Sequence, residues 1–95
     1  MWTEEMIQEK IQTRNDWLER AIVAIWNCQT SEEQSTESTR DANGKGFSAF
    51  DARMGSYWAL WLKSGKHLSG KHLERARKVM KRYVKQLVKI ANKQP

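Results

Sequence analysis

The sequence predicts an all-α fold, a compact bundle of three principal helices plus a short helical turn. Three segments of the 95-residue chain carry apolar side chains at three- and four-residue steps, the spacing of one helix face. Five Trp, two Tyr and two Phe supply large areas for burial, of the kind that disordered chains lack. Because a chain of this length can bury one core but not two, we expect a single helical domain over residues 1–95.

The first helix is expected over residues 4–28. Thr3 is a suitable N-cap, and the two glutamates after it carry the negative charge that favours the positive end of a helix dipole. Asn15 and Asp16 interrupt the apolar spacing, so one long helix or two helices in line would fit. The apolar run at residues 21–26 should be the more deeply buried end.

A polar loop over residues 29–47 is expected to follow within the same domain. Ser31 and Gln34 have the spacing of a capping box, which predicts the short helical turn. The glycine-rich residues 43–48 precede a helix, so their backbone N–H groups could hold an anion. They lack the spacing of a phosphate-binding loop, and Asp51 would place negative charge beside the anion, so an ordinary glycine-rich loop is the other interpretation.

The second helix, expected over residues 48–64, is rich in aromatic residues and should be the central helix of the bundle. Gly55 within it costs about 1 kcal/mol relative to Ala, and close approach of another helix would compensate for that cost. Gly65 is placed to cap the C-terminal end. The expected stripe on this helix consists of Phe47, Phe50, Met54, Tyr57 and Trp61, with Trp58 and Leu62 widening it.

The aromatic side chains of this segment have two interpretations. Exposed rings could stack on unpaired bases, as in proteins that bind single strands. At helical spacing and in so short a chain, however, aromatic side chains are needed to build the core. We therefore expect most of them to be buried, with Trp2 and Trp17 as exposed exceptions elsewhere in the chain. The four rings concerned are Phe47, Phe50, Trp58 and Trp61.

The third helix, expected over residues 70–92, has an apolar face and a basic face on opposite sides. On a helical wheel with Lys71 at zero and about 100° per residue, the apolar face is centred at about 160° and the basic residues lie within about 40° of zero. At about 1.5 Å per residue the basic face would extend roughly 33 Å. The apolar face consists of Leu73, Ala76, Met80, Tyr83, Leu87 and Ala91. The basic face, called here the basic ridge, consists of Lys71, Arg75, Lys78, Arg82, Lys85, Lys89 and Lys93.

The net charge of +6 is concentrated at this end of the chain. Residues 70–95 carry nine Lys or Arg and one acidic residue, a balance of +8, whereas residues 1–69 carry eight basic and ten acidic residues, a balance of −2. Such asymmetry favours polyanionic partners and fast, salt-sensitive association. A face that only solvates a terminal helix usually mixes both signs. The seven ridge residues are therefore the candidate nucleic-acid-binding residues, with simple solvation of the helix as the alternative.

No constellation in the sequence indicates catalysis, a cofactor or a metal site. His67 and His72 are five residues apart and do not share a helix face. Cys28 is the only cysteine in the chain, whereas metal sites need three or four converging ligands. No segment approaches the roughly 20 apolar residues of a membrane span, and the acidic N-terminus is not a secretory signal. We expect a non-enzymatic, cytoplasmic protein with no cofactor, no metal and no membrane partner.

Six short motifs lie between residues 29 and 87: Gln29-Thr30, Asn43 to Phe47, Asp51-Ala52, Leu68-Ser69, Ala76 to Lys78 and Lys81 to Leu87. In these motifs the chain resembles a small conserved segment of phage and mobile-element proteins. Similar segments occur as stand-alone small proteins and as extensions of helicase-type proteins. The resemblance implies a DNA-handling context, brings no assigned activity, and leaves open a structural role for Asp51 and Gln86.

Two functions from different classes fit these observations. The first is a non-catalytic nucleic-acid-binding accessory protein that applies the basic ridge to the phosphate backbone, with DNA favoured over RNA. The alternative is a protein-interaction module, a phage inhibitor or adaptor, that docks on an acidic surface of a host protein. Binding to an anionic membrane surface is disfavoured because the apolar face of the third helix is needed for the core. Self-association as a homodimer through the first helix is also open.

Overall fold

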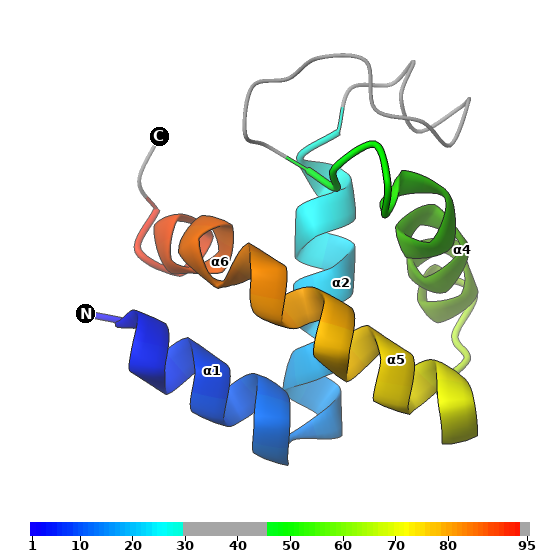
Figure 1. Ribbon diagram of the computed structural model, residues 1–95, viewed down its shortest axis with the longest axis horizontal. Helices are drawn as coiled ribbons and strands as arrows, with labels where there is room; N and C mark the ends of the chain where they lie inside the picture. The colour runs from blue at the N-terminus through cyan, green and yellow to red at the C-terminus, as the bar shows by residue number, and fades with distance from the viewer. Residues whose placement is uncertain (30–45, 94–95) are drawn as a thin grey trace.

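The computed structural model describes residues 1–29 and 46–93, and these residues fold into helices around one core (Figure 1). No strand occurs in this part of the chain, so the predicted all-α class is confirmed. The short helical turn expected after Ser31 lies outside the described residues. The helices are α1 (Glu4–Thr13), α2 (Asn15–Asn27), α4 (Ala52–Lys63), α5 (Gly70–Met80), the 3₁₀ helix η1 (Lys81–Tyr83) and α6 (Val84–Ala91).

The first predicted helix is in fact two helices that meet at Arg14. Arg14 has an extended backbone (φ −125°, ψ 114°), and α1 and α2 run in different directions on either side of it (Figure 1). The guanidinium of Arg77, on α5, donates hydrogen bonds to the carbonyl oxygens of Ile11 and Gln12. A helix leaves such carbonyls unpaired at its C-terminal end. The expectation of one helix or two in line over residues 4–28 is therefore wrong, because a side chain distant in sequence stabilises the break.

The central helix of the molecule is α2. It packs on α1, α4, α5 and α6, whereas α4 packs mainly on α2. A helix that is apolar on most sides is buried on most sides, and the run at residues 21–26 gives α2 this character. The buried residues of α2 are Leu18, Ala21, Ile22, Ile25 and Trp26. The expected burial of the run is thus confirmed, but the choice of the aromatic helix as the central one is wrong.

Helix α4 turns its small side chains towards the core and most of its large ones outwards. Its buried residues are Ala52, Gly55, Ser56, Trp58 and Ala59. Phe50, just before the helix, and Tyr57 and Trp61, on it, are exposed. At about 100° per residue, Tyr57 and Trp61 lie about opposite to Ala52, Ser56 and Ala59. Most of the expected stripe is therefore not core, because the distance between packed helices depends on the side chains at the contact and the small ones allow α4 to lie close to α2.

An aromatic ring, and not another helix, explains Gly55. A Cβ atom at this position would lie 2.5 Å from Cε2 of Phe47, well inside the usual contact distance between carbon atoms. Phe47 is fully buried and packs edge-on against Tyr83, with ring centroids 5.3 Å apart. At the other end of α4, Gly65 has φ +91° and provides the predicted C-terminal cap.

The C-terminal segment consists of α5, η1 and α6 instead of one continuous helix. Its predicted apolar face is confirmed, since every member is buried or half-buried: Leu73, Ala76, Met80, Tyr83, Leu87 and Ala91. Asn92, just after α6, accepts a hydrogen bond from the N–H of Trp2 and donates one to the Trp2 carbonyl, both at 2.9 Å. This pairing joins a residue before the start of α1 to the residue after the end of α6.

Candidate nucleic-acid interface

The basic ridge runs along the outer side of α5, η1 and α6, which together cross the molecule (Figure 1). All seven members are exposed. Lys71, Arg75 and Lys78 lie on α5, Arg82 lies in η1, and Lys85 and Lys89 lie on α6. Lys93 follows the end of α6 and has φ 55°, so it does not share the helical face on which it was expected. The ridge is therefore carried by two α-helices joined by a 3₁₀ turn, and not by one straight rod.

Six of the seven ridge cations have no ion-pair partner within the described residues. The exception is Arg82, whose Nη1 lies 3.0 Å from Oδ1 of Asp51 while its side chain remains 57% exposed. Ion-paired carboxylates would cancel the local potential, so a row of cations that mostly lacks such partners retains its attraction for a polyanion.

Below the ridge, a buried carboxylate fixes η1 against the start of α4. Asp51 accepts hydrogen bonds from the hydroxyl of Tyr83 at 2.6 Å and from Nη1 of Arg82 at 3.0 Å. The hydroxyl of Tyr83 accepts in turn from the N–H of Ser48 at 3.0 Å. Burial, reinforced by the hydrogen bond to Asp51, raises the pKa of Tyr83 above its usual 10.0. One ridge cation is thus held in place from inside the protein.

Side chains of the C-terminal segment also hold the glycine-rich segment before α4 in place. The side chain of Gln86 accepts from the N–H of Gly46 at 2.9 Å and donates to the Gly46 carbonyl at 3.1 Å. The N–H of Ser48 is used by Tyr83. Two of the backbone N–H groups considered for an anion are therefore already paired, and residues 43–45 lie outside the described part. The polar residues Asp51 and Gln86, which the resemblance includes, have structural roles here.

The sequence interpretation favoured burial for most rings of this segment, but three of them form an exposed surface, called here the outer aromatic face: Phe50, just before α4, and Tyr57 and Trp61, on α4. Their exposed fractions are 84%, 49% and 36%. The rings of Tyr57 and Trp61 are nearly parallel, with an interplanar angle of 16° and centroids 6.3 Å apart. The sequence feature that could have revealed this surface is the stripe of small residues on the opposite side of α4. Trp2 and Trp17, expected to be exposed, are half-buried and pack against each other with centroids 5.0 Å apart.

Cationic side chains adjoin this face. The guanidinium carbon of Arg82 lies 5.9 Å from the ring centroid of Phe50, and Nζ of Lys66 lies 4.1 Å from that of Trp61. A hollow of about 480 Å³ opens beside the rings; it is lined by Phe50, Arg53, Met54, Tyr57 and His72. Since Arg82 belongs to the basic ridge, the outer aromatic face and the ridge meet at Phe50 and Arg82.

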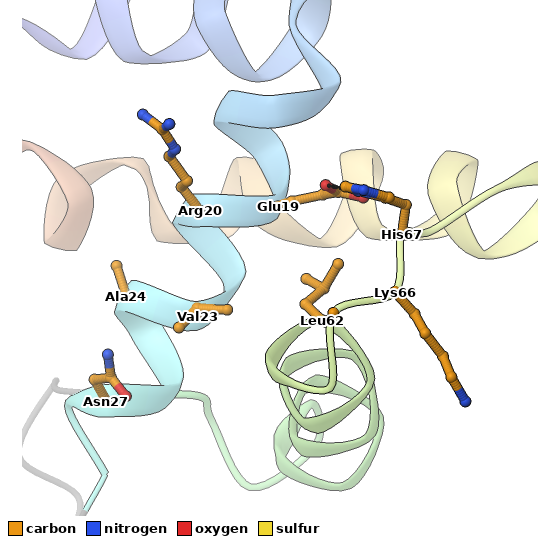
Figure 2. Close-up of a pocket in the computed structure, with 9 residues that line it drawn as sticks. Glu19, Arg20, Val23, Ala24, Asn27, Leu62, Lys66 and His67 are labelled. Atoms are coloured by element: carbon orange, nitrogen blue, oxygen red, sulfur yellow. Dashed lines mark hydrogen bonds and ion pairs between the residues drawn. The ribbon is translucent and has the colours of Figure 1, made fainter.

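Figure 2 shows a second hollow, of about 410 Å³, between α2 and the end of α4. Glu19 and His67 meet there, with Oε1 and Nδ1 2.9 Å apart, and the other carboxylate oxygen accepts the N–H of Leu68 at 2.9 Å. The side chain of Lys66 extends away from the hollow (Figure 2). Glu19 therefore holds the connection between α4 and α5 against α2, which is a structural role.

The histidines and the cysteine each have separate partners. Nδ1 of His72 accepts a hydrogen bond from the indole N–H of Trp58 at 3.2 Å, and the thiol of Cys28 donates to the Ala24 carbonyl at 3.4 Å. Within residues 1–29 and 46–93, no three His, Cys, Asp or Glu side chains lie close enough together to hold a metal ion. No helix in these two ranges has both the length and the apolar character to cross a membrane.

Comparison with protein-family models, with curated proteins and with solved structures finds no match to this chain.

Proposed function

We propose that this chain is a non-catalytic, nucleic-acid-binding accessory protein of the phage or mobile-element type, acting in the cytoplasm, that applies the basic ridge to the phosphate backbone. The observation that supports the proposal is the row of exposed cations on α5, η1 and α6, of which six lack an acidic partner in the described part of the chain. Lys and Arg stems placed in this way can reach successive phosphates. Such contacts give affinity with little sequence preference, and DNA is the favoured partner.

The salt dependence of binding follows from this mechanism. Each phosphate that a cation neutralises releases condensed counterions, so a protein that contacts about six phosphates loses about 10³-fold in affinity between about 50 and 200 mM salt. We therefore expect the observed association constant to fall steeply and linearly with salt on a double-logarithmic plot. The measurement is fluorescence anisotropy of labelled DNA and RNA oligonucleotides titrated at several salt concentrations.

A matched pair of charge-reversal variants locates the surface. Lys78→Glu with Lys85→Glu changes the ridge, whereas Arg20→Glu with Lys63→Glu changes the net charge equally on α2 and α4. We expect the ridge pair to weaken DNA binding by about tenfold or more at low salt and the control pair to weaken it less. Arg82 is excluded from the variants because it also bonds Asp51. Circular dichroism must show unchanged helix content in both.

Two results would contradict the proposal. One is the absence of binding to any oligonucleotide at low salt; the other is an equal loss of binding in both pairs, which would indicate net charge alone. The alternative partner, an acidic surface of a host protein, is distinguished by a pull-down with nuclease treatment. Partners that remain after nuclease and are lost with the ridge pair would favour the alternative.

A further inference from the structure

We propose that the outer aromatic face, Phe50, Tyr57 and Trp61, is a base-stacking surface, and that the preferred ligand is therefore a single-stranded nucleic acid. This inference rests on the proposed function and adds the strand state of the ligand. The phosphates of the strand would lie along the basic ridge, and its unpaired bases would lie on the rings of the outer aromatic face.

The exposure of the three rings is the first observation. Large apolar side chains that gather on one exposed face mark interaction sites more often than isolated ones do. Phe50 is 84% exposed, and Tyr57 and Trp61 lie almost parallel. Every base has a flat π-face, so aromatic side chains of this kind bind unpaired bases with little dependence on sequence. In a duplex those base faces are stacked on each other and are inaccessible.

The second observation is that Arg82 joins the two surfaces. Its guanidinium is fixed by Asp51 on one side and lies 5.9 Å from the ring centroid of Phe50 on the other. The cation is thus held at the boundary between the ridge and the rings, where a nucleotide with its phosphate on Arg82 would have its base near Phe50. Arginine guanidinium groups also stack on bases themselves.

The third observation is that a further ring continues the outer aromatic face and a second cation lies at its far end. The imidazole of His72, which follows the ridge residue Lys71, lies 5.8 Å from the ring of Tyr57, centroid to centroid. At the far end Nζ of Lys66 lies over Trp61. Proteins that bind single strands without sequence preference combine these two elements, a positive track for the backbone and rings for the bases.

Charge disfavours a second copy of the chain as the occupant. In a two-fold dimer the same patch meets itself, so Arg53, Lys66 and Arg82 of one copy would face the same cations of the other. Like charges brought together in this way oppose association. A strand of nucleic acid instead supplies negative charge and flat apolar rings together. These complement the cations and the aromatic rings of this surface.

Three oligonucleotides of equal phosphate number test the inference: single-stranded oligothymidine, an abasic strand, and a duplex of the same total number of phosphates. Fluorescence anisotropy at one low salt concentration gives the affinities. Stacking strengthens binding by about five- to a hundredfold per base. We expect oligothymidine to bind at least about tenfold more tightly than the abasic strand, which retains the phosphates but presents no bases.

The matched variants remove rings but keep apolar bulk. Phe50→Leu with Tyr57→Leu removes two of the three rings and should lower the affinity for oligothymidine towards that for the abasic strand, while leaving the affinity for the duplex unchanged. The control, Leu60→Ala, shortens another exposed side chain of the same helix without removing a ring. It should alter none of the three affinities. Thermal unfolding verifies that all variants remain folded.

The outcomes separate the two proposals. Equal affinities for oligothymidine and the abasic strand, or no effect of the double variant, overturn base stacking and leave the ridge proposal standing. No binding to any of the three ligands overturns the proposed function and, with it, this inference. Sedimentation that shows a dimer abolished by the double variant would identify the face as a self-association surface, which also overturns base stacking.

Discussion

The two tryptophans of α4 show how differently the two faces of one helix are used. Trp58 is fully buried and donates its indole N–H to His72, whereas Trp61, three residues later, is 36% exposed and carries Lys66 on its ring. The inner face otherwise consists of small residues packed on α2, and the outer face of large rings beside the basic ridge. An aromatic stripe with helical spacing therefore does not by itself identify the core side of a helix.

The largest effect should come from removing the buried ring. Truncation of a buried Trp or Phe to Ala costs about 3 to 5 kcal/mol of unfolding free energy, so we expect Trp58→Ala to lose that amount and Trp61→Ala to lose much less. Urea unfolding followed by circular dichroism gives both values. If Trp58→Ala is too unstable to measure, Trp58→Phe against Trp61→Phe preserves the comparison. Equal losses in the two positions would contradict the assignment of the faces.

Asp51→Ala should have the next largest effect. The variant removes the acceptor that lies 2.6 Å from the buried hydroxyl of Tyr83 and leaves only the more distant Oγ of Ser48, at 3.2 Å. A buried polar group whose hydrogen bond is lost or poorly made costs about 1 to 3 kcal/mol. We therefore expect a loss of about 2 to 3 kcal/mol of unfolding free energy, measured as above. Asp51→Asn retains one acceptor oxygen and should lose less. A loss below about 0.5 kcal/mol, the range of ordinary surface substitutions, would show that the carboxylate is not structural.

Gly55→Ala tests the close approach of Phe47 on the inner face. Overpacking costs about 1 to 3 kcal/mol, and the better helix propensity of Ala returns about 1 kcal/mol. The net result should be a loss of up to about 2 kcal/mol of unfolding free energy. Combining Gly55→Ala with Phe47→Leu should be less harmful than the sum of the two single changes, because the smaller side chain makes room. Stabilisation by Gly55→Ala alone would argue against the contact.

Tyr83→Phe should cost about 1 kcal/mol at neutral pH, the usual value of a hydrogen bond, and the cost should depend on pH. The pKa of Tyr83 is raised in the folded protein above the ordinary 10.0. Its stabilising contribution is therefore complete below about pH 10 and is lost as the pH rises through the folded-state pKa. The lysines are common to both proteins, so their titration largely cancels in the difference. We expect the gap in unfolding free energy to be constant between about pH 7 and 9 and to narrow above about pH 10; a gap that widens there would contradict the mechanism.

The smallest effect should occur on the outer face. Phe50→Ser removes a ring that is 84% exposed, and surface substitutions usually change the unfolding free energy by no more than about 0.5 kcal/mol. The melting temperature should therefore remain close to that of the parent protein. A large destabilisation would mean that the ring belongs to the core, and the outer face would then not be free to bind a ligand.

Several features follow from residues that are neighbours in the sequence, and the sequence predicted these correctly. The side-chain oxygen of Thr3 accepts from the N–H of Met6 at 3.2 Å, so the N-terminal cap is where it was expected. Gly65 ends α4, and the C-terminal segment buries its apolar face and exposes its cations. These features depend on contacts within one or two helical turns, which composition and spacing contain. The use of the ridge in binding remains a prediction.

Other features depend on groups far apart in the sequence, and only the tertiary structure decided them. The break at Arg14 is stabilised by Arg77, and the segment before α4 is held by Gln86 and Tyr83. Either the stripe of small residues or the stripe of aromatic residues on α4 could have faced the core. The small residues do so because the large apolar side chains of α2 already fill the space there, and no local pattern in α4 contains that information.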